Sequence, residues 1–156
     1  MNLATELVRM HLTRSVKPFV FHDGCDESLP FAECEEPGLY VHIPFCKRIC
    51  GFCPYCKVEY SKDACDRYVD ALLREIELAA SHIEGRKRVG SLYFGGGTPA
   101  LAANRMKEIV DALSAHFEIS GGVGVELHPD NVVPEILQTL KEAGATKLSI
   151  GVQSFQ

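Results

Sequence analysis

The stretch CKRICGFCPYC, from Cys46 to Cys56, carries four of the seven cysteines of this 156-residue chain. Cys46, Cys50 and Cys53 follow one another at spacings of four and three residues, and Cys56 comes three residues later. The stretch begins shortly after an apolar run at 39–43 that a proline closes. Parallel α/β folds place their ligand-binding loops after the carboxyl ends of strands. The cysteines therefore mark a candidate metal or catalytic loop.

Two kinds of metal site suit these thiols. Thiolates are the usual ligands of iron–sulfur clusters, and three on one short loop can surround a single cluster whose fourth iron stays open to a small molecule. Zinc is the alternative, because structural zinc sites use cysteines two to four residues apart. Such sites commonly use two separated pairs, and no second C-x-x-C follows this loop. The spacing favours the iron–sulfur cluster over zinc, and thiols without any metal are the remaining interpretation.

Strand and helix patterns alternate along the chain from residue 38 onward. Short β-rich runs that end at Pro or Gly alternate with apolar residues at helical spacing. The expected elements are a strand at 39–43, a helix at 63–83, a strand at 91–94, a helix around 106–117, a strand at 123–127, a helix from 134 to 144 and a strand at 147–152. This alternation predicts an α/β fold with a parallel sheet. A closed barrel needs about 250 residues, so we expect an open sheet or the front part of an interrupted barrel.

Four segments carry ordered motifs at the ends of the expected strands. They are Tyr40–Cys46 (YVHIPFC) with the cysteines that follow it, Tyr93–Pro99 (YFGGGTP), Val125–Pro129 (VELHP) and Leu148–Phe155 (LSIGVQSF). Together they resemble the radical S-adenosylmethionine (SAM) superfamily, and more narrowly the oxygen-independent coproporphyrinogen III oxidase group, over residues 38–156. The resemblance implies the N-terminal part of a partial (β/α)6 TIM-like barrel with about four βα units. It also implies a [4Fe–4S] cluster and SAM as cofactors.

The resemblance assigns roles to individual residues. Cys46, Cys50 and Cys53 would hold the cluster, and they are both the metal ligands and the catalytic residues. Phe52 would help to shield the cluster from water. The three glycines at 95–97 lack a Cβ, so their backbone can approach the methionine end of SAM, unless they form a plain tight turn. The residues expected to bind SAM are Tyr40, Phe52, Gly95, Gly96, Gly97, Thr98, Glu126 and Gln153.

The polar candidates among these residues have alternative roles. Thr98 would either contact the methionine carboxylate or cap the next helical turn. Glu126 ends an apolar strand, so its carboxylate should face the barrel mouth and SAM unless it pairs with Lys or Arg. Gln153 holds the equivalent place on the fourth strand and can hydrogen-bond to ribose or substrate. Tyr40 and His42 share one face of the first strand, where they either contact a ligand or pack.

The resemblance also implies a reaction. In the family, SAM on the open iron is cleaved by one electron, and the resulting 5′-deoxyadenosyl radical takes hydrogen from the substrate. This chain would be an oxidoreductase similar to coproporphyrinogen dehydrogenase, acting on a tetrapyrrole in porphyrin biosynthesis with flavodoxin or ferredoxin as electron donor. Radical methyltransferases, haem-degrading enzymes and haem chaperones have similar sequences and are the alternatives. A zinc-binding α/β domain without redox chemistry is a further one.

Three positions depart from the pattern of the coproporphyrinogen oxidases. A fourth cysteine commonly lies two residues after the third, where this chain has Tyr55, and Cys56 follows it. His128 and Lys147 stand where that group often has Asp or Asn and Arg, respectively. By the resemblance, these positions belong to the substrate side of the site more than to the SAM side. The expectation of radical generation is therefore firmer than that of a particular substrate.

Composition and charge exclude other classes of function. The net charge is −5, whereas broad nucleic-acid binding needs a basic face. The chain contains no apolar run long enough for a membrane span and no basic secretory n-region. We therefore expect a cytoplasmic protein without a membrane span.

The chain divides into two parts by composition. Residues 1–37 are predicted to form an N-terminal arm, with a short helix at 3–14 and an acidic linker that contains Cys25 and Cys34. Residues 38–156 are predicted to form the radical SAM core, truncated after the fourth strand. On this interpretation the chain is a fragment that is inactive in full turnover.

Overall fold

A four-stranded parallel sheet forms the centre of the molecule in the computed structural model, which describes residues 34–51 and 53–152. Its strands are β1 (Gly38–Ile43), β5 (Ser91–Gly96), β7 (Val123–Leu127) and β8 (Ala145–Ile150). They lie in the order β1-β5-β7-β8, so each strand pairs with the next one along the chain. This is the parallel α/β arrangement that the sequence predicts. Residues 1–33 of the predicted arm, with the helix predicted at 3–14, lie outside the described residues.

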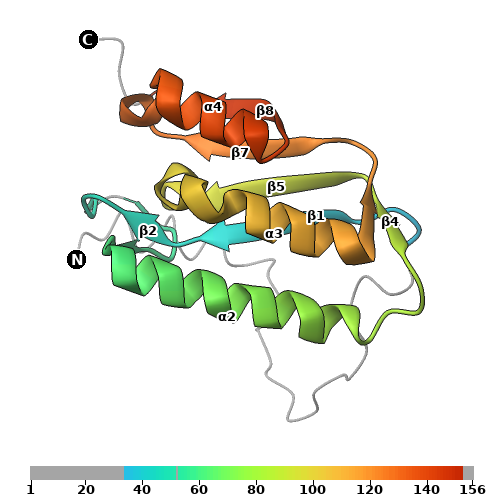
Figure 1. The fold of residues 1–156 in the computed structure, drawn as a ribbon. Coiled ribbons are helices and arrows are strands. Elements are labelled where there is room, and N and C mark those ends of the chain that lie inside the picture. The colour runs from blue at the N-terminus through green and yellow to red at the C-terminus, as the bar shows by residue number, and fades with distance from the viewer. Residues whose placement is uncertain (1–33, 52, 153–156) are drawn as a thin grey trace, which may run out of the picture.

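Three α-helices connect the strands and cover one face of the sheet (Figure 1). They are α2 (Lys62–Ala80), α3 (Ala103–His116) and α4 (Pro134–Glu142). The alternation of strand side chains explains this layering, because every second residue of a strand points to the same face. Among the buried residues between sheet and helices are Val41, Ile43, Leu92, Phe94, Val125 and Leu127 from the strands and Val69, Met106, Ile109 and Leu140 from the helices.

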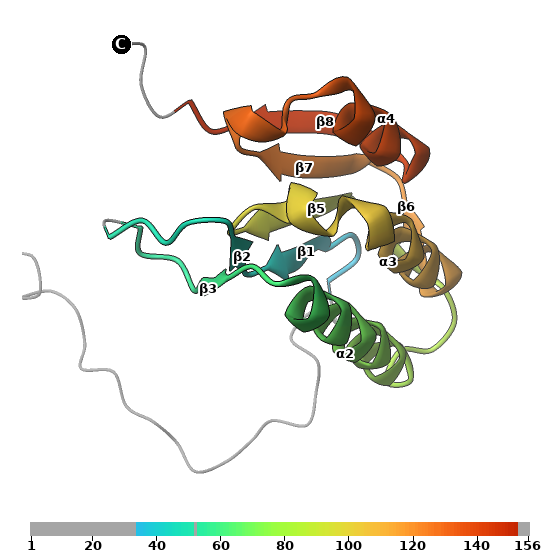
Figure 2. The same ribbon diagram turned by 60° about the vertical axis from the view of Figure 1, so that its left-hand side comes forward.

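The opposite face of the sheet carries a different set of side chains. Tyr40 and His42 of β1, Tyr93 of β5 and Glu126 of β7 alternate with the buried strand residues. We call these four residues the helix-free face, because α2, α3 and α4 lie on the other side of the sheet (Figure 2). In a (β/α) barrel this face lines the interior, and side chains near the carboxyl ends of its strands lie next to the mouth where ligands bind.

The ends of the helices follow from local sequence signals. Helix α2 starts after Ser61, whose side chain accepts a hydrogen bond from the Ala64 backbone N–H at 3.2 Å. It ends at Ala80, three residues before the predicted end at 83, and Ser81 caps it with bonds to the Glu77 and Ala79 carbonyls. Helix α4 has Pro134 in its first turn, as predicted.

Short strands are the elements that the sequence pattern missed. Strand β2 (Phe45–Cys46) pairs with β3 (Val58–Glu59), and β4 (Lys87–Val89) pairs with β6 (Phe117–Ile119). Strands of two or three residues are too short to show an alternating pattern. The helix predicted around 106–117 ends at His116 for this reason, because Phe117 starts β6. Two 3-10 turns, η1 (Pro99–Ala102) and η2 (Pro129–Asn131), follow β5 and β7.

Within the described part of the chain, each helix is either too short or too polar to cross a bilayer.

Candidate cofactor site

The cysteine loop emerges where β1 ends and is tied together at its base. Strands β2 and β3 pair there, with Phe45 opposite Val58 and Cys46 opposite Glu59. The Val58 N–H donates to the Pro44 carbonyl at 2.8 Å, outside the strand pairing itself. The loop of residues 46–57 therefore starts and ends at one place, at the carboxyl end of the sheet.

The thiols on this loop differ in exposure. Cys46 and Cys53 are half-buried, whereas Cys50 and Cys56 are exposed. The Cys53 N–H donates to the Cys50 carbonyl at 3.3 Å, so these two predicted ligands belong to one turn. Among the described side chains, no three from Cys, His, Asp or Glu converge on one metal position. Cysteine thiolates are the usual ligands of iron–sulfur clusters, so these residues suit such a cluster chemically. Cluster binding requires the loop to bring the three sulfurs to one point.

Glycines 95–97 lie against the side chains of the first strand and of the cysteine loop. A Cβ on Gly95 would stand 2.9 Å from the Tyr40 ring, and one on Gly96 would stand 2.8 Å from the His42 ring. A Cβ on Gly97 would stand 2.5 Å from the Phe45 carbonyl oxygen and 2.9 Å from the Cys46 sulfur. The space that the glycines leave is thus filled by residues of this chain. Close approach of SAM stays a prediction, and the packing supplies a separate reason for glycine.

Thr98 stands next to the first cysteine of the loop. It occupies the N-cap position of η1, but its side chain makes no capping hydrogen bond there. Its backbone N–H donates to the Phe45 carbonyl at 2.7 Å. Its hydroxyl lies 4.0 Å from the Cys46 sulfur. Side-chain capping, one of the two predicted roles of Thr98, is therefore wrong, and a SAM contact stays a prediction.

Tyr40 and His42 form a connected pair on the helix-free face. The Tyr40 hydroxyl lies 3.3 Å from His42 Nδ1, and His42 Nε2 lies 3.0 Å from the Cys56 carbonyl oxygen. A carbonyl only accepts, so His42 Nε2 is the donor to Cys56, and the Tyr40 hydroxyl is placed to donate to Nδ1. The Tyr68 hydroxyl donates to the His42 carbonyl at 2.6 Å from helix α2. His42 thus ties the cysteine loop to β1.

The environment of Tyr40 acts on its ionisation. Its ring stacks on that of Tyr93, with centroids 6.4 Å apart and planes 16° apart. Burial raises the pKa of the Tyr40 phenol above its usual value, and the negative charge of Glu126 raises it further. Tyr40 nevertheless keeps 60% of its surface exposed. A phenol in this place stays protonated at neutral pH and can donate a hydrogen bond to a ligand.

Glu126 lies on the helix-free face near the end of β7, and its predicted contact with SAM stays a prediction. It is partly exposed and makes no ion pair with Lys or Arg among residues 34–51 and 53–152. The alternative of a structural ion pair therefore has no support in the described part. A carboxylate at this position can receive a cationic or hydroxyl group of a ligand.

Two of the positions that depart from the coproporphyrinogen oxidase pattern have local roles in the fold. His128 Nδ1 accepts from the Asp130 backbone N–H at 3.2 Å and so caps η2. The Lys147 amine donates to the Gly121 carbonyl at 3.0 Å, before the start of β7 and away from the cysteine loop. Phe52 and Gln153, both predicted to contact the cofactors, lie outside the described residues.

Three residues near the site were missed by sequence reasoning. Tyr93 pairs with Tyr40 in the strand register, so the alternation along β5 could have placed it on the same face. Gly124 makes room for it, because a Cβ there would stand 2.7 Å from the Tyr93 ring. Tyr68 comes from helix α2, and no local pattern indicates that it reaches β1.

A hollow of about 320 Å³ lies beside the site, between β1 and α2. Tyr40, His42 and Tyr68 line it together with apolar residues of both elements. Neither the glycines at 95–97 nor the described residues of the cysteine loop are among the residues that line it.

Comparison with known proteins assigns the chain to a family. The Radical SAM superfamily model matches residues 40–156, which include β1 from Tyr40 onward, the cysteine loop, the glycines and the other three strands of the sheet. The chain therefore belongs to the radical SAM superfamily, as the ordered motifs predict.

The individual relatives within that superfamily have different functions by name. The chain is 37% identical to the oxygen-independent coproporphyrinogen III oxidase of Pseudomonas aeruginosa over 149 residues, which is 86% of this chain and 32% of that protein. It is 37% identical to anaerobilin synthase of Escherichia coli O157:H7 over 121 residues, 75% of this chain and 27% of the relative.

A solved structure shows the same fold. Coproporphyrinogen III oxidase (HemN) from Escherichia coli, a radical SAM enzyme, superposes with a TM-score of 0.69 at 34% identity. The match covers 78% of this chain and 29% of that one. The described fold thus corresponds to part of a partial radical SAM barrel, as predicted. The chain spans about a third of the length of the relatives it matches.

Proposed function

We propose that this chain carries the cofactor-binding part of a radical SAM enzyme, with a [4Fe–4S] cluster held by Cys46, Cys50 and Cys53. The observation that carries the proposal is their common loop at the carboxyl end of β1, packed against Gly97 and Thr98 in a superfamily member. When bound, the cluster and SAM supply the electron transfer and the 5′-deoxyadenosyl radical.

The residues around the loop would bind and orient the cofactor. The backbone of Gly95–Gly97 and the carboxylate of Glu126 offer acceptors for the ammonium or ribose of SAM. Tyr40, protonated at neutral pH, offers a donor from the helix-free face. Phe52 and Gln153 complete the predicted set. The interior position of this face would keep water away from a reactive radical.

The substrate proposal rests on the relatives. A tetrapyrrole is favoured because the relatives include a coproporphyrinogen III oxidase and an anaerobilin synthase. The enzyme would resemble coproporphyrinogen dehydrogenase and act in porphyrin biosynthesis, in the cytoplasm, with flavodoxin or ferredoxin as electron donor. A radical methyltransferase, a haem-degrading enzyme and a haem chaperone remain the alternatives.

Anaerobic reconstitution with iron and sulfide tests the cluster. We expect the reduced chain to give a [4Fe–4S]⁺ EPR signal that changes when SAM is added. Cys50→Ser should abolish this signal, whereas Cys34→Ser, an exposed thiol outside the loop, should keep it. Bound zinc with no cluster signal would refute the proposal and support a structural metal loop.

A further inference from the structure

The end of β5 is bonded directly to the start of the cysteine loop. The Gly97 N–H donates to the Ile43 carbonyl at 2.8 Å, and the Thr98 N–H donates to the Phe45 carbonyl at 2.7 Å. These two bonds extend the contact between β1 and β5 past the last paired residues, Ile43 and Gly96. They hold the backbone carbonyls of Ile43 and Phe45 against β5 and its following loop. Because Phe45 directly precedes Cys46, these bonds limit the positions that Cys46 can occupy.

Close packing restricts the Cys46 side chain further. The missing Cβ of Gly97 would fall 2.9 Å from the Cys46 sulfur and 2.5 Å from the Phe45 carbonyl oxygen. Cβ atoms do not approach other heavy atoms so closely. The sulfur of Cys46 therefore rests against the Gly97 backbone, which no other residue at position 97 would allow.

The Thr98 hydroxyl is the polar group nearest to this sulfur among the hydrogen bonds of the described residues. Its oxygen lies 4.0 Å from the Cys46 sulfur, with Cys46 as the acceptor. Sulfur is large and accepts over longer distances than oxygen, and an ionised thiolate accepts more strongly than a thiol. The hydroxyl has no competing capping bond in η1. The Thr98 hydroxyl is thus available to donate a hydrogen bond to the Cys46 thiolate.

We propose that Thr98 is a positioning residue for Cys46, the first cluster ligand: its hydroxyl donates to the Cys46 thiolate, while the Gly97 backbone packs against the same sulfur. This inference rests on the proposed function. It gives Thr98 a task distinct from binding the methionine carboxylate of SAM. Hydrogen bonds to ligand sulfurs stabilise the more negative, reduced state of a cluster, so Thr98 also raises the reduction potential.

The first test uses the metal-free chain and two variants of one residue. Thr98→Val keeps the shape and removes the donor, whereas Thr98→Ser keeps the donor. Thr139→Val is the matched control, because Thr139 donates to Glu135 within α4, far from the loop along the chain. Iodoacetamide labelling followed by peptide mass spectrometry measures the alkylation rate of Cys46 relative to Cys50. Loss of the hydroxyl contact removes a restraint on the Cys46 side chain, so the alkylation rate of Cys46 relative to Cys50 should change at least about threefold in Thr98→Val, whereas Thr98→Ser and the control should match the wild type.

The second test uses the chain loaded with its cluster. Thr98→Val should lower the midpoint potential of the cluster and shift its EPR spectrum without SAM, and Thr98→Ser should restore both. An unchanged alkylation ratio in Thr98→Val overturns the inference, whatever the cluster does. If the wild type assembles no cluster, the proposed function fails, while the alkylation ratio still decides whether Thr98 serves Cys46. If only SAM binding changes in Thr98→Val, Thr98 is a cofactor contact and the inference is wrong.

Discussion

Gly95 and Gly96 lie directly beneath the rings of Tyr40 and His42 on the neighbouring strand. The missing Cβ atoms would stand 2.9 Å and 2.8 Å from those rings. Gly96 also has a φ of +115°, a backbone conformation that residues with a side chain rarely adopt. Glycine is needed here for packing and backbone geometry, in addition to any approach of SAM.

Replacing Gly96 should therefore destabilise the chain measurably. In Gly96→Ala the Cβ would meet the His42 ring at 2.8 Å and the Ile43 carbonyl oxygen at 2.9 Å. Strain at a positive φ alone costs about 1–3 kcal/mol, so we expect at least that loss in the free energy of unfolding by urea. Gly51→Ala is the control, because nothing lies within 4 Å of its Cβ position, and its effect should stay within about 0.5 kcal/mol. Equal losses in both variants would contradict the packing argument.

Glu126 should control the ionisation of Tyr40. A negative carboxylate disfavours the negative phenolate, so Glu126→Gln should lower the Tyr40 pKa toward the ordinary value of 10.0. Burial, the larger cause of the shift, remains in the variant. NMR titration of ¹³C-labelled tyrosine measures the pKa, with Tyr40→Phe to assign the signal. Glu118→Gln on β6 should leave it unchanged, and a rise in Glu126→Gln would show that the sign of the coupling is wrong.

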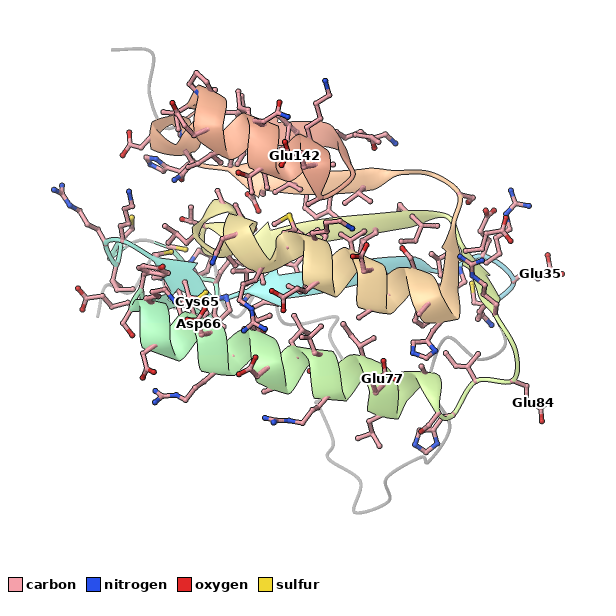
Figure 3. The ribbon with its side chains drawn as sticks, in the orientation of Figure 1. Glu35, Cys65, Asp66, Glu77, Glu84 and Glu142 are labelled. Carbon is pink, nitrogen blue, oxygen red and sulfur yellow. The ribbon has the colours of Figure 1, made fainter. Side chains whose placement is uncertain are left out.

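At the scale of elements, polar contacts between α2 and α3 supplement their apolar packing. The Arg105 side chain on α3 is 17% exposed and donates to the Asp70 carboxylate at 2.7 Å and to the Asp66 carbonyl at 2.9 Å. Hydrogen bonds to Glu108 and Asp70 raise the pKa of its guanidinium, so it stays charged. At the other end, His116 of α3 lies 3.1 Å from Glu77 of α2, which Figure 3 labels. These contacts fasten α3 to α2 at both ends.

Arg105 should therefore contribute more to stability than other ion-pair residues of α3. Arg105→Ala should lower the free energy of unfolding by about 1–2 kcal/mol, because it leaves the Asp66 carbonyl and the Asp70 carboxylate without this partner. Lys107→Ala removes an exposed pair with Asp111 within the same helix, and should cost less than about 0.5 kcal/mol. Urea denaturation of both variants measures the difference, and a larger loss in Lys107→Ala would refute this assignment.

At the scale of the whole molecule, the two edges of the sheet differ. Strand β1 has α2 and the cysteine loop beside it, whereas β8 pairs with β7 alone among the described strands. Leu148 and Ile150 on β8 are 47% and 45% exposed. A strand edge with exposed apolar side chains is a template for pairing with another chain.

The 156-residue chain should accordingly self-associate through β8. We expect size-exclusion chromatography with light scattering to show species larger than a monomer at high protein concentration. Leu148→Lys should shift the distribution to monomer, because an inserted charge opposes strand pairing. Leu78→Lys changes an apolar residue of α2 that is 65% exposed, and should have a smaller effect. A wild-type chain that stays monomeric, or an equal effect of both variants, would contradict a role for the β8 edge.

Local patterns determined the order of strands and helices, the parallel sheet and the place of the cysteine loop. Each of these features depends on a signal within a short segment, which is apolar periodicity, a terminating Pro or Gly, or cysteine spacing. The ordered motifs determined the superfamily for the same reason, because each occupies one strand end. Short strands such as β2 were not predicted, because two residues are too few to show an alternating pattern.

Tertiary structure alone decided which side chains meet at the site. The Tyr40 ring over Gly95, the Tyr68 bond to β1 and the Thr98 hydroxyl beside Cys46 join residues 26 to 55 positions apart. Such contacts depend on the register between strands and on the side of the sheet that each helix covers. Register follows from matching the buried faces of neighbouring strands, and no single segment of the sequence contains that match.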